Sequence, residues 1–145
     1  AEKFLSFMKN ELFPFVESNY SVDSANRILM GCSFGGLFTL YAMFTQTQMF
    51  SGYVAASPAV GWDKGVIYKF EKYYNQLQPQ KPVKLYLTVG DVEGSLPEYK
   101  KFVAQLMSRN YSSVSIQSKV LENTGHSGTK SETFGRGLQF IFQKR

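Results

Sequence analysis

The pentapeptide Gly31-Cys32-Ser33-Phe34-Gly35 constrains this chain most, because an apolar run, 27–30, precedes it and a helix-like stretch, 37–44, follows it. A G-x-S-x-G sequence at a strand-to-helix turn is typical of a nucleophile elbow. In such a turn the serine has a strained backbone and stands exposed at the end of the strand. We expect the glycines two residues either side of Ser33 to be required, because those positions are crowded.

A serine at such a turn supports acyl transfer when a base can take its proton. The chain contains one histidine, His126, so elimination assigns the base. It lies in the polar, glycine-rich loop 122–128, at the end of a predicted strand, where parallel sheets carry their chemistry. A lone histidine in such a loop is otherwise a surface or capping residue, but the elbow favours the catalytic interpretation. The backbone N–H of Phe34, at the start of the helix, is a predicted oxyanion donor.

Two carboxylates compete to orient that histidine. The buried run 84–89 ends in a loop that contains Asp91 and Glu93. Asp91 directly follows a glycine and could cap the turn through its short side chain, whereas Glu93 has the reach to meet His126. The sequence therefore favours Glu93. The order nucleophile, acid, histidine is the order of the α/β-hydrolase fold.

Strand and helix patterns alternate along the chain. We predict strands at 27–32, 52–56, 83–89 and 113–121, and helices at 2–20, 35–45, 63–77, 96–110 and 130–143. This alternation predicts a three-layer α/β sandwich, with a mostly parallel sheet and helices on both faces. Pro14 should kink or shorten the first helix, because proline lacks the N–H and crowds the preceding turn.

The ends and faces of the last two helices are also predicted. Ser95 and Thr129 each stand three residues before a glutamate, a spacing typical of helix caps. Apolar periodicity predicts that the last helix faces the sheet through Phe134, Leu138, Ile141 and Phe142.

Composition excludes several function classes. The chain has a net charge of +5, but its basic residues are scattered, so we expect no nucleic-acid binding. No segment is long and apolar enough to cross a membrane. One histidine and one cysteine without paired spacing predict no metal site, and we expect no cofactor. Cys32 is interpreted as a small buried apolar residue. We expect a soluble protein, and the sequence leaves open whether it is cytoplasmic or is periplasmic or secreted.

Residues 31–38, 50–58 and the pair Trp62-Asp63 resemble the putative-esterase group of α/β-hydrolases. That group includes esterase D, feruloyl esterases and ferric-enterobactin esterases. The resemblance implies hydrolysis of a small-molecule carboxylic ester through an acyl-enzyme. Ser33 then corresponds to the nucleophile, His126 to the base and Glu93 to the acid. Trp62 follows the end of the second predicted strand and is a predicted substrate contact.

The chain has four predicted strands, whereas that fold has about eight. We therefore expect residues 1–145 to be a single α/β-hydrolase domain fragment, the carboxyl-terminal half, without the amino-terminal strands. Its exposed first strand is predicted to pair with the amino-terminal half of the same polypeptide or with a second copy. Two alternatives to an esterase remain. One is a serine peptidase of the prolyl-oligopeptidase type, and the other is a fragment that is inactive until its sheet is completed.

Overall fold

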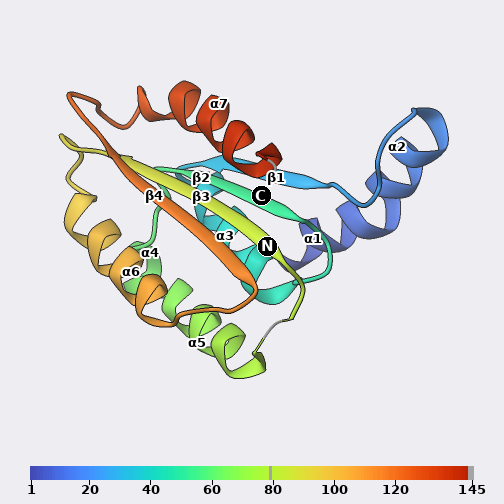
Figure 1. Cartoon of the computed structure of the whole chain (residues 1–145), viewed down its shortest axis with the longest axis horizontal. Coiled ribbons are helices and arrows are strands. Elements are labelled where there is room, and N and C mark those ends of the chain that lie inside the picture. Colours follow the sequence, from blue (N-terminus) through green and yellow to red (C-terminus); the bar gives the residue numbers. More distant parts are fainter. Residues whose placement is uncertain (79, 144–145) are drawn as a thin grey trace.

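Four parallel strands form one sheet in the order β1-β2-β3-β4 in the computed structural model, which describes residues 1–78 and 80–143 (Figure 1). The strands are β1 (Ile28–Cys32), β2 (Gly52–Ala56), β3 (Val83–Gly90) and β4 (Val114–Leu121). These bounds confirm the predicted strands to within one residue. Because every neighbouring pair is parallel, all four carboxyl ends meet at one edge of the sheet.

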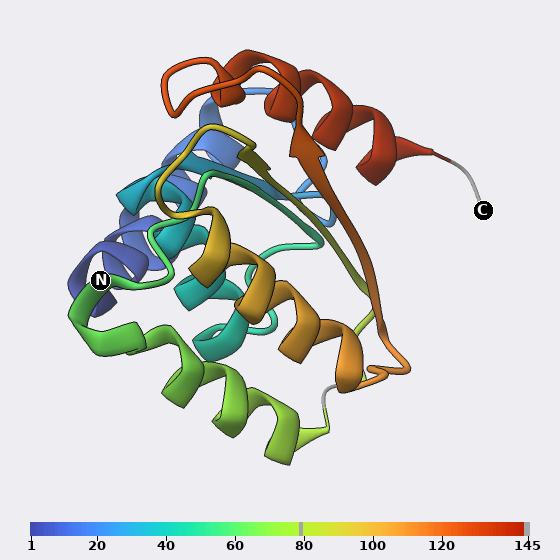
Figure 2. The same cartoon turned by 90° about the vertical axis from the view of Figure 1, so that its left-hand side faces the viewer.

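Helices cover both faces of this sheet. On one face lie α3 (Phe34–Thr45), α5 (Ile67–Leu77) and α6 (Leu96–Ser108), and on the other lies α7 (Thr129–Phe142) (Figures 1 and 2). The predicted three-layer sandwich is therefore confirmed. The predicted helix 63–77 is divided, because Asp63 and Lys64 have left-handed backbone angles within the short α4 (Trp62–Gly65). Strand β2 is buried along its whole length, as expected for a central strand covered on both faces.

The first predicted helix is three consecutive segments, α1 (Glu2–Phe7), the π-helical η1 (Met8–Leu12) and α2 (Phe13–Asn19). The π-helical turn ends two residues before Pro14, and the Phe13 N–H donates to the Met8 carbonyl five residues back. A wider turn accommodates a ring that lacks an N–H. Pro14 thus changes the local winding, while the helical path continues to Asn19.

Helix α7 does not face the sheet as its apolar periodicity predicts. Leu138 and Phe142 are 36% and 63% exposed, so that part of the prediction is wrong. Small residues spaced four apart are buried in their place: Thr129, Thr133 and Gly137. A Cβ on Gly137 would lie 2.6 Å from Val54 Cγ1. The helix therefore approaches the sheet too closely for large side chains.

A lysine from the sheet fixes the carboxyl end of α7. The Lys84 Nζ on β3 donates to the carbonyl oxygens of Phe140, Ile141 and Gln143 at 3.1, 2.9 and 2.8 Å. A cation at this position satisfies free carbonyls and complements the helix dipole. The contact helps to hold the helix whose other end follows the His126 loop.

Strand β2 also contains a polar group without a hydrogen-bond partner among the described residues. The Tyr53 hydroxyl is buried and has no hydrogen-bond partner among the described residues. Because an unsatisfied buried hydroxyl is costly, we expect Tyr53→Phe to raise the free energy of unfolding by about 1 kcal/mol in urea denaturation. Tyr99→Phe is the control, since the Tyr99 hydroxyl bonds Ser118 Oγ at 2.9 Å and its loss should destabilise the protein. Equal destabilisation by both changes would contradict this interpretation of Tyr53.

Candidate active site

Ser33 has the strained backbone that the elbow predicts. It lies between β1 and α3 with φ 57° and ψ −118°, a conformation that residues other than glycine rarely adopt. Its N–H donates to the Ala56 carbonyl at 2.9 Å, and its own carbonyl accepts from the N–H groups of Leu37 and Ala59. The end of β2 and the segment after it therefore hold the strained turn from both sides.

Gly31 and Gly36 make room for this turn, whereas Gly35 differs from the expectation. A Cβ on Gly31 would lie 2.1 Å from the Gly35 carbonyl oxygen, which confirms that Gly31 is required. No atom lies within 4 Å of a Cβ built on Gly35, so the expected crowding there is wrong. Gly36 is crowded in its place, because its Cβ would lie 3.0 Å from Pro58 Cα. The carbonyl of Gly35, and not its Cα, occupies the tight space.

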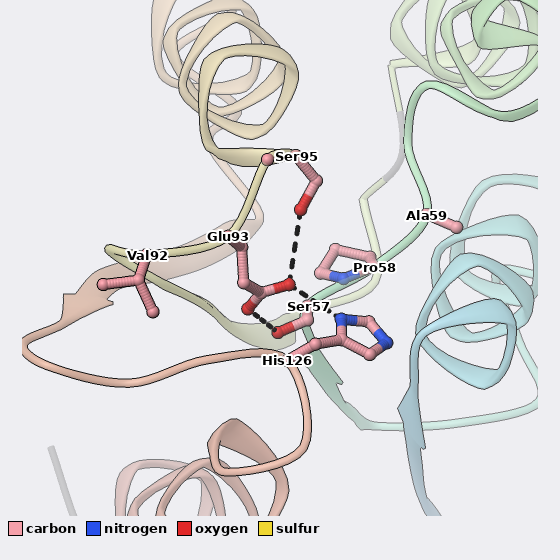
Figure 3. Close-up of a pocket in the computed structure, with 8 residues that line it drawn as sticks. Ser57, Pro58, Ala59, Val92, Glu93, Ser95 and His126 are labelled. Carbon is pink, nitrogen blue, oxygen red and sulfur yellow. Dashed lines mark hydrogen bonds and ion pairs between the residues drawn. The ribbon is translucent and has the colours of Figure 1, made fainter.

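Glu93 and His126 form a direct pair at the same edge of the sheet. The His126 Nδ1 lies 2.7 Å from Glu93 Oε2 (Figure 3). The Glu93 side chain is 4% exposed and the His126 side chain 52%. Asp91, by contrast, is exposed and accepts the Thr124 N–H at 3.1 Å. The structure therefore places Glu93 beside the histidine and Asp91 in the turn.

The buried carboxylate has further donors. Its Oε1 accepts from the Gly90 N–H at 2.7 Å and from the Ser57 hydroxyl at 2.5 Å. Ser95 Oγ donates to Oε2 at 3.3 Å. Burial raises the pKa of Glu93, but the hydrogen bonds from Ser57, Gly90 and His126 together outweigh it and hold the pKa below its usual value. The structure thus favours an ionised carboxylate facing the imidazole.

The hydroxyls predicted to cap helices serve this cluster instead. Neither Ser95 nor Thr129 makes a side-chain capping bond, so both cap predictions are wrong. Ser95 bonds Glu93, and Thr129 Oγ1 lies 2.8 Å from Ser57 Oγ. Sequence reasoning missed Ser57 altogether. Its only signal is a serine at the end of a buried strand, next to a proline.

Ser33 is not hydrogen-bonded to His126 in the described part of the chain. The second ring nitrogen of His126, Nε2, is turned away from Glu93 (Figure 3). A cavity of about 440 Å³ opens beside the pair and includes Ser57 and Val92 in its lining. The hydrogen bond between a catalytic serine and its histidine is often long in a free enzyme and tightens when a substrate binds.

Phe34 and Trp62 form an aromatic pair beside the elbow. Their rings meet edge to face with centroids 6.0 Å apart, and both are more than half exposed. They border an apolar cavity of about 430 Å³ whose lining includes Tyr41 and Phe70. The predicted substrate contact Trp62 thus reaches the elbow through the side chain of Phe34, the predicted oxyanion residue.

Within residues 1–78 and 80–143, no three histidine, cysteine or acidic side chains are grouped as a metal site would require. The same residues contain no helix with the length and hydrophobicity needed to span a membrane.

The glycine geometry predicts opposite outcomes for two matched changes. We expect Gly31→Ala to destabilise the protein severely, because the new methyl group would collide with backbone. Gly35→Ala should be tolerated or stabilising by up to about 1 kcal/mol, since alanine favours the helix. Thermal unfolding of the two variants measures this difference. A Gly35→Ala protein that unfolds as readily as Gly31→Ala would contradict the geometry.

Known proteins resemble this chain in sequence and in fold. It is 33% identical over 95 residues to the ferri-bacillibactin esterase BesA of Bacillus subtilis, a match that covers 64% of this chain and 33% of that protein. It is 41% identical over 64 residues to the siderophore triacetylfusarinine C esterase of Aspergillus fumigatus, covering 43% of this chain and 22% of that one. The BES protein from Bacillus cereus superposes with a TM-score of 0.93 at 25% identity.

That superposition covers 99% of this chain and 55% of the Bacillus cereus chain. The chain thus spans about half the length of this solved relative, and its match spans a third of the Bacillus subtilis enzyme. The sequence profile of the family described as "Putative esterase" matches residues 1–133. Because that match covers more than half of the chain, the chain belongs to the putative esterase family.

Proposed function

We propose that this site hydrolyses a carboxylic ester through an acyl-enzyme intermediate. The observation that carries the proposal is the 2.7 Å contact between Glu93 and His126 at the sheet edge where Ser33 occupies a strained strand-to-helix turn. Membership of an esterase family supports the same reaction class. Ser33 acts as the nucleophile, His126 as the base and Glu93 as the carboxylate that orients the base.

The proton of the Ser33 hydroxyl is transferred through His126. His126 Nε2 takes the proton of Ser33 Oγ as that oxygen attacks the ester carbon, and the ionised Glu93 stabilises the resulting imidazolium. The Phe34 N–H, at the amino end of α3, donates to the oxyanion. Collapse breaks the bond to the alcohol, which leaves with the proton from His126. Water then attacks the acyl-enzyme, with His126 again as the base, and releases the acid.

The aromatic pair beside the elbow indicates the kind of ester. Phe34 and Trp62 offer exposed ring surface, and the cavity next to them is apolar. An ester with an aromatic or apolar group adjacent to the scissile bond fits this surface. Two of the relatives are named as a ferri-bacillibactin esterase and a siderophore triacetylfusarinine C esterase, which supports a siderophore ester as the substrate class. The net charge of +5 suits an anionic ester of this kind.

We also propose that β1 receives another strand in the whole protein. Among the described strands, β1 pairs only with β2, so one edge of it is open. The solved relative is nearly twice as long as the part that this chain matches, which supports the remainder of the same polypeptide as the partner. A second copy of the chain is the competing occupant. Concentration-dependent dimerisation in light scattering would favour that competitor and contradict this proposal.

Labelling with a fluorescent fluorophosphonate tests the reaction. We expect mass spectrometry to find the adduct on Ser33, and Ser33→Ala and His126→Ala to lower the labelling rate by about 1,000-fold or more. Glu93→Gln should lower the labelling rate less, because His126 itself is still present even though its orienting carboxylate is lost. Ser127→Ala, at an exposed serine in the His126 loop, is the matched control and should label normally.

A substrate panel then separates esterase from peptidase. The proposal predicts turnover of aryl and siderophore esters and none of proline-containing peptides. If Ser33 stays unlabelled both in the chain alone and in a longer polypeptide that completes the sheet, the proposed function is wrong.

A further inference from the structure

Ser57 occupies a position where its backbone conformation is unfavourable for serine. It directly follows β2, its φ is 42°, and the residue is 3% exposed. A glycine would adopt this left-handed conformation without strain, whereas serine pays a steric cost for it. What serine adds at this position is a hydroxyl, and that hydroxyl points at the Glu93 carboxylate (Figure 3).

The proton count fixes the direction of the hydrogen bonds. Ser57 Oγ lies 2.5 Å from Glu93 Oε1 and 2.8 Å from Thr129 Oγ1. An ionised carboxylate has no proton to give, so Ser57 donates its single proton to Glu93. Thr129 must then share its single proton between Ser57 Oγ at 2.8 Å and the His126 carbonyl oxygen at 3.1 Å, because both are acceptors within its reach. The chain of donors runs from α7 through the end of β2 to the acid.

The two oxygens of Glu93 therefore have different surroundings. Oε1 accepts from Ser57 and from the Gly90 N–H, which approach from two different strands. Oε2 faces His126. Without the Ser57 hydroxyl, Gly90 alone would hold Oε1, and the carboxylate could rotate about its last bond.

We propose that Ser57, oriented by Thr129, is a positioning residue that fixes the rotation of the Glu93 carboxylate so that Oε2 faces His126. This inference rests on the proposed function, because it assigns a part in the same site. The same Thr129 hydroxyl also donates to the loop that carries His126, since its Oγ1 lies 3.1 Å from the His126 carbonyl oxygen. One hydroxyl pair thus connects the acid to the base loop.

Other groups around the acid must be considered for its pH dependence. His126 contacts Glu93 directly. Cys32 lies at the end of β1, and burial raises the pKa of its thiol, an effect to which the charge of Glu93 adds and which the charge of Lys130 opposes. Because the hydrogen bond from Ser57 helps to hold the pKa of Glu93 below its usual value, its removal should raise that pKa while these neighbours stay in place.

The kinetic test uses Ser57→Ala and Ser57→Gly. We expect kcat for an aryl ester to fall by about 10-fold with KM unchanged, as for other residues that orient a catalytic group. The acid limb of the profile of kcat against pH should move to higher pH, because the Glu93 carboxyl then takes up its proton at a higher pH. Ser57→Gly should have a higher melting temperature than Ser57→Ala, because both variants lose the donor to Glu93 and only glycine relieves the left-handed strain. A similar loss of kcat in two variants of different stability therefore cannot be attributed to a damaged fold.

Two controls sharpen this test. Asn110→Gly changes another non-glycine residue with a positive φ, 51°, outside the cluster, and should leave kcat unchanged. Thr129→Val should reproduce the Ser57 effect in weaker form, while Thr129→Ser should retain wild-type kinetics. A wild-type kcat and pH profile in both Ser57 variants would overturn the proposal.

A second readout does not depend on catalysis. A ¹³C NMR titration of the Glu93 carboxyl, assigned with Glu93→Gln, should show a raised pKa in both Ser57 variants. An unchanged titration would overturn the positioning role even in an active enzyme. If Ser33 proves unreactive, the proposed function fails, whereas this titration still decides whether Ser57 holds Glu93.

Discussion

The burial of the Glu93 carboxylate is the constraint on which the site depends. An ionised carboxylate with a 4% exposed side chain is strongly unfavourable unless hydrogen-bond donors surround it. Four donors do so: the Gly90 N–H, Ser57, Ser95 and His126. They come from the ends of two strands, the start of α6 and the loop before α7. Satisfying this one charge therefore brings together segments that are far apart in the sequence.

The end of β2 connects that carboxylate to the strained turn at Ser33. Ala56 accepts the Ser33 N–H, the next residue, Ser57, donates to Glu93, and Pro58 packs against Gly36. Both Ser33 and Ser57 have positive φ values, 57° and 42°. Backbone strain of this kind persists only where neighbouring structure holds it, and it is concentrated at functional sites. The end of β2 thus holds Ser33, the proposed nucleophile, on one side and Glu93, the proposed acid, on the other.

Much of this arrangement could be predicted from local patterns. Apolar runs predicted the strands, and the G-x-S-x-G turn indicated a strained Ser33. The length of the Glu93 side chain predicted that it would contact the only histidine in the sequence. Features that depend on tertiary distance could not be predicted in this way. Periodicity placed Leu138 inward, but the close approach of α7 to Val54 admits only small residues. The spacing of Ser95 and Thr129 is typical of helix caps. Their hydroxyls bond Glu93 and Ser57 instead, because the buried charge of Glu93 needs hydrogen-bond donors around it. The open space at Gly35 likewise depends on how the turn packs.

The proposed function requires that the Glu93 carboxylate hold His126 with Nδ1 toward the acid and Nε2 free to act as the base. ¹⁵N NMR of the imidazole measures this most directly, and His126 is the only histidine in the chain, so its signals need no assignment. At a pH where the ring is neutral, we expect the tautomer with the proton on Nδ1, and a loss of that preference in Glu93→Gln. A ring that carries its proton on Nε2, or a preference that Glu93→Gln leaves unchanged, would contradict it.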